Sequence, residues 1–337
     1  MSDQILRALL LRNERGGFSA SVENLDFDDL PQAGDVLVQI SFSCLNYKDA
    51  LAVTDESPIV RGDYPFVPGI DLAGTVIESD DPLFHEGDIV ISTGGGIGEK
   101  CWGGLSTAQR IPSKYLVKAP IGLSTRHAMI FGTAGVTAML SVMDLENAGV
   151  KPEHGEVLVT GATGGVGSFS IMLLQKAGFD VVACTGKPEA AEYLKRLGAT
   201  RILNRREYEL EKLRPLDKSR WTAAVDTVGG TLLARVISQI NTHGAVAVCG
   251  LAGGSELNTT VFPFILRGIN LLGIDSNTCS VPIREKVWAR MLEDISVSEL
   301  EAMATEITLD DVVDISRQFL AGKITGRYYV SLDDSQD

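Results

Sequence analysis

The stretch Val157-Leu-Val-Thr-Gly-Ala-Thr-Gly-Gly-Val-Gly167 decides the fold of this 337-residue chain. Its apolar start predicts a buried strand, and residues 166–177 have a helical pattern that Gly178 is placed to end. The turn between them is close to the dinucleotide fingerprint G-x-G-x-x-G, with Ala162 in the first glycine position. A tight turn without a ligand would explain the glycines too, but a strand before the turn and a helix after it favour a dinucleotide.

Each part of this turn has an expected role. Gly164 would let the backbone approach a pyrophosphate, and Gly167 would let the helix pack closely on the strand. The N-terminus of the helix would present free N–H groups and a positive dipole end to the phosphates. The residues expected to hold the pyrophosphate are therefore Thr163, Gly164, Gly165 and Val166.

The surrounding sequence alternates strands with helices, which predicts an α/β fold with a doubly wound parallel sheet of the Rossmann type. A second strand is expected at 180–184, followed by a helix at 189–197 that begins near Pro188 and ends at Gly198. Later strands of the same sheet are expected at residues 223–226, 245–249 and 271–274.

The residues on either side of this region have a different texture. Residues 1–125 read as mainly β, with strands expected at 34–42, 73–78 and 88–92. After residue 277 we expect two helices and then a strand, at 283–292, 309–320 and 327–331.

The end of the second strand indicates which dinucleotide binds. An NAD site usually has an acidic residue there, on the ribose 2′-hydroxyl. Here the strand ends Cys184-Thr-Gly-Lys187, with a hydroxyl from Thr185, a close approach at Gly186 and a cation at Lys187. These residues suit a ribose 2′-phosphate and hence NADP(H). We favour this phosphate-binding role for Lys187 over the alternative that it is an ordinary exposed lysine. Arg201 is either a second cation for that phosphate or a surface arginine.

Charge and composition exclude other classes of function. Lysine and arginine number 30 against 44 acidic residues, a net charge of −14 that disfavours nucleic acid and anionic membrane surfaces. The five cysteines are dispersed and predict neither disulfides nor a zinc ribbon. Residues 1–11 lack a signal-peptide pattern. Of the two uncharged stretches, 128–143 is too short to span a membrane, and 157–175 is better explained by the glycine-rich turn than by a membrane helix. We therefore expect a soluble, cytoplasmic protein that does not bind membranes.

Several motifs together resemble the medium-chain dehydrogenase/reductase superfamily, in its zinc-free, quinone-oxidoreductase-like branch. The glycine turn is joined by motifs at Asn46–Asp49, Pro68–Asp71 and Gly132–Ala138. Further motifs resemble the YhdH/AcuI acryloyl-CoA reductase group: Trp102–Gly104, Asp226–Gly229, Cys249–Gly254 and Pro263–Arg267. The resemblance runs from about residue 5 to 331.

This resemblance implies a GroES-like β-barrel catalytic domain (1–125 and 277–337), a Rossmann NADP-binding domain (126–276) and an active site in the cleft between them. It also implies a homodimer, paired through the last Rossmann strand at 271–274. Zinc members of the superfamily carry Cys where Asn46 stands and His where Ile70 stands. Both ligands are replaced here, so we expect no metal and a reaction that depends on hydride transfer from the nicotinamide.

The resemblance also suggests site residues. Tyr47 is expected near nicotinamide and substrate, as a hydrogen-bond donor or proton source, or as a packing residue only. Asn46 would hydrogen-bond to substrate or nicotinamide ribose, whereas Lys48 and Asp49, which could equally form a surface ion pair, are assigned no chemistry. The other residues expected to bind the cofactor are Thr133, Leu251, Ile265, Ser276 and Arg327.

Alternatives remain for two of these residues and for the substrate. Thr133 would begin a helix of small residues that either approaches the cofactor or only packs tightly, and Arg327 would be either near the cofactor or a surface charge. Gly95 and Cys101 replace the Trp and His of many members of the acryloyl-CoA reductase group. The substrate is expected to be acryloyl-CoA or a similar small enoyl thioester, with a quinone as the alternative. If the protein is not an enzyme, the alternative is a non-catalytic NADP-binding protein.

Overall fold

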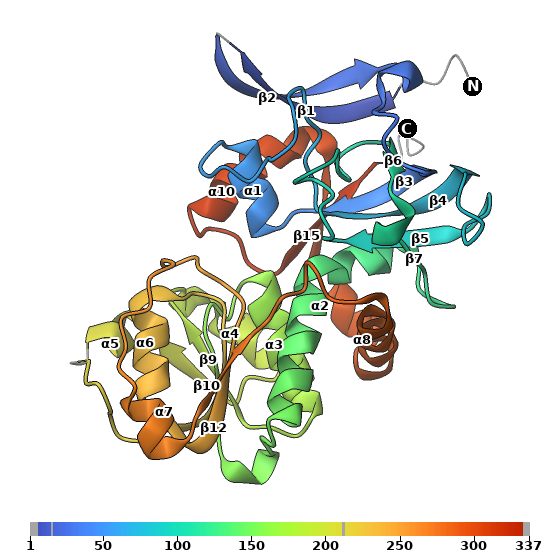
Figure 1. Cartoon of the computed structure of the whole chain (residues 1–337). Helices are drawn as coiled ribbons and strands as arrows, with labels where there is room; N and C mark the ends of the chain where they lie inside the picture. Colours follow the sequence, from blue (N-terminus) through green and yellow to red (C-terminus); the bar gives the residue numbers. More distant parts are fainter. Residues whose placement is uncertain (1–5, 15, 211–212, 333–337) are drawn as a thin grey trace. The chain divides into compact units, whose positions relative to one another are not determined.

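The computed structural model describes residues 6–14, 16–210 and 213–332 (Figure 1). The first five residues of the stretch searched for a signal peptide lie outside this part. The chain divides into two compact units, one of residues 1–133, 277–289 and 297–337, the other of residues 134–276 and 290–296. The domain boundaries expected from the sequence stay a prediction, because compact packing alone does not define functional domains.

The first unit is built on β strands. Its strands are β1 (Leu6–Glu14), β2 (Gly17–Leu25), β3 (Val36–Cys44), β4 (Asp71–Ser79), β5 (Ile89–Thr93), β6 (Ala108–Ile111), β7 (Val117–Lys118), β14 (Ala304–Thr308) and β15 (Arg327–Ser331). Its helices are α1 (Tyr47–Val53), α9 (Val297–Glu301) and α10 (Val312–Leu320), with a 3-10 turn, η5 (Leu309–Asp311), before α10.

These strands form a hairpin, β1–β2, and a larger sheet ordered β14-β15-β3-β4-β5-β7, with β6 also paired to β3. Strand β15, which lies close to the C-terminus, pairs antiparallel with β3 near the N-terminus, so Tyr329 lies opposite Cys44. The alternation of apolar residues along β3 and β4 buries one face of the sheet in a core that includes Val38, Val76 and Val330. This pairing brings β15 beside the start of α1.

The second unit is a parallel sheet with helices. Its strands are β8 (Val157–Val159), β9 (Val181–Thr185), β10 (Arg201–Asn204), β11 (Trp221–Asp226), β12 (Ile240–Val248) and β13 (Asn270–Gly273). Its helices are α3 (Gly165–Lys176), α4 (Ala191–Arg196), α5 (Arg205–Leu210), α6 (Gly230–Ser238) and α7 (Phe262–Arg267).

The strand order is β10-β9-β8-β11-β12-β13, with every neighbouring pair parallel. The predicted doubly wound sheet is therefore confirmed, and the order reverses between β8 and β11. Ligands of such sheets bind at the carboxyl ends of the strands beside this reversal. The glycine turn that follows β8 lies at this place.

Two helices belong partly to each unit, α2 (Thr125–Asn147) and α8 (Val281–Asp294). Helix α2 is interrupted at Gly132, whose φ of 49° and ψ of −161° are not helical. Among the described residues, α2 alone is long and apolar enough to cross a membrane, but 83% of that window is buried inside the protein. The apolar character of α2 is thus that of a core helix.

The expected elements are present with shifted ends. The helix expected at 189–197 is divided into a 3-10 turn, η4 (Pro188–Ala190), and α4, and Gly198 ends it with a φ of 107°. The sequence pattern missed the strands β1, β2, β6, β7, β10 and β14 and the short helices α1, α5, α6, α7 and α9. These elements are short or lack regular alternation, so local periodicity does not identify them.

Candidate functional site

The glycine turn of the second unit joins β8 to α3 and contains two positions that have no room for a side chain. A Cβ on Gly161, where φ is 57°, would lie 2.1 Å from the Oγ1 of Thr227. A Cβ on Gly167 would lie 2.5 Å from the carbonyl oxygen of Gly161, so this glycine lets the helix pack against the turn. Gly164 is the N-cap of α3 and its surroundings are more open. The expected cradle therefore places the N-terminus of a 12-residue helix beside an accessible glycine.

A buried carboxylate shapes the neighbouring strand end. Asp226, at the end of β11, accepts hydrogen bonds from the Oγ1 of Thr160 at 2.7 Å and from the backbone N–H of Gly229 at 2.7 Å. Burial raises the pKa of Asp226, and these hydrogen bonds oppose that rise. Asp226 thus connects the ends of β8 and β11 at the reversal of strand order, a role that the sequence pattern did not suggest.

The end of β9 brings together the residues expected at the 2′-phosphate. The backbone N–H of Lys187 donates to the Oγ1 of Thr185 at 3.0 Å, which closes a small turn around Gly186. Burial lowers the pKa of Lys187, and Glu189 opposes this. The structure adds a residue here: a Cβ on Gly186 would lie 3.2 Å from the guanidinium of Arg205. Arg205 begins α5 directly after β10, and the sequence analysis missed it because it missed that strand.

Arg201 does not lie with these residues. In the parallel pairing of β10 with β9, Arg201 is opposite Val182, whereas Asn204 is opposite Thr185. Three residues of strand separate the two levels by about 10 Å. The guanidinium of Arg201 instead forms an ion pair with Glu156 at 2.7 Å and lies over the ring of Trp221. The expectation that Arg201 lies beside Thr185 and Lys187 is corrected accordingly, and the arginine that the structure places near Gly186 is Arg205.

Other expected residues of the second unit are spread along the chain. Leu251 and Ile265 are exposed, and Ser276 accepts a hydrogen bond from the Oγ1 of Thr137 at 2.8 Å. Leu251 follows β12 at its carboxyl end, the edge at which such sheets bind ligands. Their contacts with a cofactor stay a prediction.

In the first unit, the motif Asn46–Asp49 forms the start of α1. The carboxylate of Asp49 is buried and accepts hydrogen bonds from the backbone N–H groups of Asn46 and Ile70, both at 2.9 Å. Burial, followed by the charge of Asp71, raises the pKa of Asp49 to about 7. Tyr47 is the first residue of the helix and is half-buried, with its ring 6.3 Å from that of Phe319.

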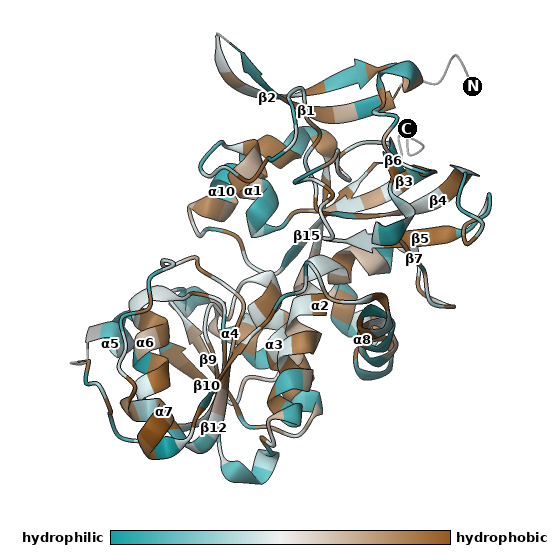
Figure 2. Ribbon diagram, in the orientation of Figure 1, coloured by the Kyte–Doolittle hydropathy of each residue, from teal (hydrophilic) through white to brown (hydrophobic). Residues whose placement is uncertain are grey.

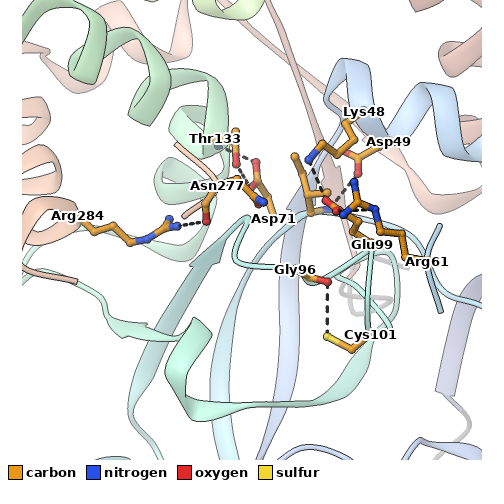
Figure 3. Close-up of polar contacts among 11 residues, drawn as sticks. Lys48, Asp49, Arg61, Asp71, Gly96, Glu99, Cys101, Thr133, Asn277 and Arg284 are labelled. Atoms are coloured by element: carbon orange, nitrogen blue, oxygen red, sulfur yellow. Dashed lines mark hydrogen bonds and ion pairs between the residues drawn. The ribbon is translucent and has the colours of Figure 1, made fainter. Parts of the chain in front are cut away.

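Lys48 and Asp49 do not form an ion pair with each other, which was the possibility that the sequence offered. Lys48 instead pairs with the buried Glu99 at 3.0 Å, and Arg61 approaches the other oxygen of Glu99 at 3.4 Å (Figure 3). The side chain of Asp49 is buried, and its carboxylate binds the backbone N–H groups of Asn46 and Ile70 instead of a lysine. Glu99 thus connects α1 to the glycine-rich loop 94–98.

Gly95 and Cys101, the two residues at which the sequence departs from the group that it resembles, lie in the longer segment 93–104. Burial raises the pKa of Cys101 to about 11, so its thiol stays protonated at neutral pH, and its Sγ lies 3.7 Å from the carbonyl oxygen of Gly96. A Cβ on Gly95 would lie 2.7 Å from the ring of Tyr115. Both Gly95 and Tyr115 line a cavity of about 270 Å³. Tyr115 therefore lies where a side chain at position 95 would go.

Asn46, Thr133 and Arg327, which are far apart in sequence, lie around Asp71. Thr133 donates to the Asp71 carboxylate from its backbone N–H at 2.7 Å and from its Oγ1 at 2.5 Å (Figure 3). The Nδ2 of Asn46 lies 2.9 Å from Oδ2 of Asp71 and 3.1 Å from Oδ2 of Asp49. Both amide hydrogens of Asn46 are thus occupied, and this geometry favours a positioning role over a direct contact with substrate.

Arg327 is 2% exposed, so the alternative of a surface charge is wrong. Its guanidinium donates to the carbonyl oxygen of Ile130 at 2.9 Å and contacts the Sγ of Cys44 at 2.9 Å. In the position of the zinc ligands of related enzymes, the chain has the amide of Asn46 and the apolar Ile70. Within the described residues, no group of three or more His, Cys, Asp or Glu could hold a metal ion. The donor set therefore does not fit zinc.

Comparisons with known proteins agree with this architecture. Residues 32–121 match the family model "Alcohol dehydrogenase GroES-like domain", and residues 165–296 match "Zinc-binding dehydrogenase". The chain is 47% identical to "Acrylyl-CoA reductase AcuI" of Ruegeria pomeroyi, over 95% of this chain and 96% of that protein.

Two solved structures have a fold similar to that of this chain. The yhdH oxidoreductase of Salmonella enterica, in complex with NADP, has a TM-score of 0.94 and 49% identity, covering 97% of this chain and 100% of that one. The Bacillus subtilis protein yhfP, solved with NAD bound, has a TM-score of 0.92 and 45% identity, covering 98% and 100%. A curated relative, YhfP of Bacillus subtilis, is 46% identical over 97% of this chain and 99% of its own, and is named provisionally as a quinone oxidoreductase.

Proposed function

Since the chain belongs to the AcuI/YhdH family of medium-chain dehydrogenases/reductases, we propose that it reduces the C=C bond of a small 2-enoyl thioester with NADPH. Acryloyl-CoA, reduced to propanoyl-CoA, is the substrate that the acrylyl-CoA reductase name of a near-full-length relative supports. The protein is then an oxidoreductase that acts on CH–CH bonds.

The cofactor assignment rests on the residues that meet at the end of β9. Thr185, Gly186 and Lys187 form a turn there, and the guanidinium of Arg205 lies against Gly186. Two cations and a hydroxyl at this point suit a 2′-phosphate, whereas an NAD site would carry an acid. The NADP-bound relative from Salmonella enterica supports the same cofactor. The glycine turn at the N-terminus of α3 would hold the pyrophosphate.

The chemistry left to the chain is binding, orientation and proton transfer. NADPH, when bound, supplies a hydride to the β-carbon of the enoyl group. This leaves the negative charge of an enolate on the thioester oxygen, and the α-carbon must then receive a proton. We assign Tyr47 to this end of the reaction, with its hydroxyl donating a hydrogen bond to the developing oxyanion or the proton to the α-carbon. Because Asn46 and Ile70 stand where zinc ligands would be, no step is assigned to a metal.

Quinone reduction is the second candidate, and the name of the Bacillus subtilis relative YhfP favours it. A quinone would accept the same hydride, so both reactions would use the part of the site that holds the nicotinamide. Only the thioester would also require a surface that binds coenzyme A. A non-catalytic NADP-binding protein is a third candidate from another class. The complete glycine turn and a tyrosine at position 47 weigh against it.

The molecule is further proposed to be a cytoplasmic homodimer. Strand β13 is at one edge of the parallel sheet, with Leu271 exposed. Helix α7, rich in hydrophobic residues in Figure 2, contributes exposed Phe262, Ile265 and Leu266 in the same unit. An unpaired edge beside a cluster of exposed apolar side chains is typical of a surface covered by a second copy. The five free cysteines suit a reducing compartment.

The decisive experiment measures NADPH oxidation by the purified protein with acryloyl-CoA, crotonyl-CoA and a benzoquinone in parallel. We expect the highest kcat/KM with acryloyl-CoA. Turnover of the quinone without either thioester would overturn the leading proposal in favour of the second. Tight NADPH binding with no turnover of any of the three would favour the non-catalytic role.

A further inference from the structure

The carboxylate of Asp71 is the point at which several distant segments of the first unit meet. Asp71 begins β4 and is 0% exposed. Its Oδ1 accepts a hydrogen bond from the Oγ1 of Thr133 at 2.5 Å. Its Oδ2 accepts three more, from the backbone N–H of Thr133 at 2.7 Å, the Nδ2 of Asn46 at 2.9 Å and the thiol of Cys44 at 2.9 Å. A buried carboxylate with this many donors holds each of them in a narrow geometry.

The second charge of the cluster fixes the orientation of its members. Arg327 donates from Nη2 to the Sγ of Cys44 at 2.9 Å and from Nη1 to the Oδ1 of Asn46 at 3.3 Å. The side-chain amide of Asn46 therefore has its oxygen toward the cation and its nitrogen toward the carboxylate. Burial raises the pKa of the Cys44 thiol well above its usual range, and the charge of Asp71 adds to this, so the thiol keeps the hydrogen that it donates.

The backbone is shaped to reach this carboxylate. At Gly132, φ is 49° and helix α2 is interrupted, which turns the N–H of Thr133 toward Asp71. A Cβ on Gly132 would lie 2.7 Å from Oδ2 of Asp71, 2.6 Å from the Sγ of Cys44 and 2.8 Å from Nη2 of Arg327. The backbone of Gly132 therefore packs directly against the cluster, with no room for a side chain at this position.

We propose that Asp71 is the positioning residue of the reaction: through Asn46 it holds the first turn of α1, which carries Tyr47, and through Thr133 it holds the start of the second segment of α2. This inference deepens the proposed function and rests on it, because it concerns the placement of the proposed donor. Asn46 is the N-cap of α1 and is bonded by its side chain to Asp71 and by its backbone to Asp49. Loss of the Asp71 carboxylate therefore removes one of the two carboxylates that hold the side-chain amide of Asn46, the residue directly before Tyr47.

The test is a double-mutant cycle on the turnover of acryloyl-CoA with Asp71→Asn and Tyr47→Phe. Misplacement of a reacting group by about 1 Å costs roughly a hundredfold in rate, so Asp71→Asn should lower kcat by about ten- to a hundredfold. The KM for NADPH should stay within about twofold. In the Tyr47→Phe background, Asp71→Asn should have little further effect on kcat, since the group that it positions is gone. Fold losses that multiply in the double variant would overturn the proposal.

Two further variants keep the test decisive. Ser43→Ala is the matched control, because Ser43 is also buried and its Oγ donates at 2.7 Å to the backbone oxygen of Asp71 without touching the carboxylate. It should lower stability and leave kcat unchanged, and an equal loss of kcat would show a merely structural effect and overturn the proposal. Asn46→Ala cuts the same connection from the other side if Asp71→Asn does not fold, and its effect should likewise vanish in the Tyr47→Phe background.

Hydrogen–deuterium exchange separates this proposal from the proposed function, since it requires no turnover. Asp71→Asn should increase exchange in residues 47–53 and 133–136 ahead of the rest of the protein, whereas Ser43→Ala should not. If this exchange pattern is seen but the wild-type protein does not reduce acryloyl-CoA, the proposed substrate is refuted and the positioning role of Asp71 is retained. Unchanged exchange in both segments would refute the positioning role, whatever the substrate.

Discussion

Arg201 and Glu156 form a bidentate ion pair, with Nη2 of the arginine 2.7 Å from one carboxylate oxygen and Nε 3.2 Å from the other. Arg201 begins β10, so this pair lies at the amino end of the parallel sheet. The cofactor of such a fold binds at the carboxyl ends. We therefore expect selectivity for the 2′-phosphate to depend on Lys187 and Arg205 rather than on Arg201.

The first prediction concerns this selectivity. Lys187→Ala and Arg205→Ala should each raise the KM for NADPH by about ten- to a hundredfold, because a charged hydrogen bond contributes about 1.5–3 kcal/mol. The KM for NADH should change little. Steady-state kinetics with both cofactors checks this, with Arg201→Ala as the matched control that leaves both constants unchanged. Equal rises for NADPH and NADH would remove the 2′-phosphate role.

The second prediction concerns the donor hydroxyl. Tyr47→Phe should lower kcat with acryloyl-CoA by about a hundredfold or more, as expected when a general acid is lost. The Kd for NADPH, measured by fluorescence titration, should be unchanged. Tyr64→Phe removes a hydroxyl from another half-buried tyrosine of the same unit and should leave kcat unchanged. An undiminished kcat in Tyr47→Phe would mean that Tyr47 only packs.

The third prediction concerns the interruption of α2. Gly132→Ala should lower the free energy of unfolding by about 1–3 kcal/mol more than a substitution that meets only a positive φ. Its Cβ would meet Cys44, Asp71 and Arg327. Gly122→Ala is the comparison, since φ is 88° there and nothing lies within 4 Å of a Cβ. Urea unfolding measures both variants, and equal losses would show that the crowding at Gly132 is relieved without cost.

The fourth prediction follows from the carboxyl of Asp49, whose pKa is raised from 3.8 to about 7 by burial and by Asp71. Between these values the unfolded chain releases the proton while the folded protein keeps it, so the folded state binds more protons. The free energy of unfolding therefore falls as pH rises from about 4 to about 7 and is level above that.

The difference in stability between the wild type and Asp49→Asn isolates this group from the other carboxyls. Urea unfolding at intervals from pH 4.5 to pH 8 should show the wild type losing stability relative to the variant as pH rises, with a constant difference above about pH 7. A difference that does not change with pH would contradict a raised pKa.

The fifth prediction concerns the edge of the parallel sheet. Leu271→Asp places a charge on β13 and should shift the protein from dimer to monomer, as measured by light scattering after size-exclusion chromatography. Leu83→Asp makes the same change at another exposed leucine, in the first unit, and should leave the dimer intact. A dimer that survives Leu271→Asp would place the interface elsewhere.

Much of the fold could be predicted from local sequence. The glycine turn after 157–160, the helix that follows it and the strand before Lys187 were all visible because their signals lie within a few residues of one another. Strand β10 was not visible, since Arg201–Asn204 has two polar residues in four and no apolar run, and Arg205 was therefore not considered as a second cation. Arg205 became recognisable once the parallel register placed it beside Gly186.

The sequence by itself determined the βαβ alternation and the glycine turn, because periodicity and turn chemistry act over short stretches of chain. Only the tertiary structure decided that Asn46, Thr133 and Arg327 meet around the buried carboxylate of Asp71. Their burial depends on β15 pairing with β3 and on the interruption of α2 at Gly132. A buried polar group must find its partners wherever the topology places them, and that placement is set by the packing of distant segments.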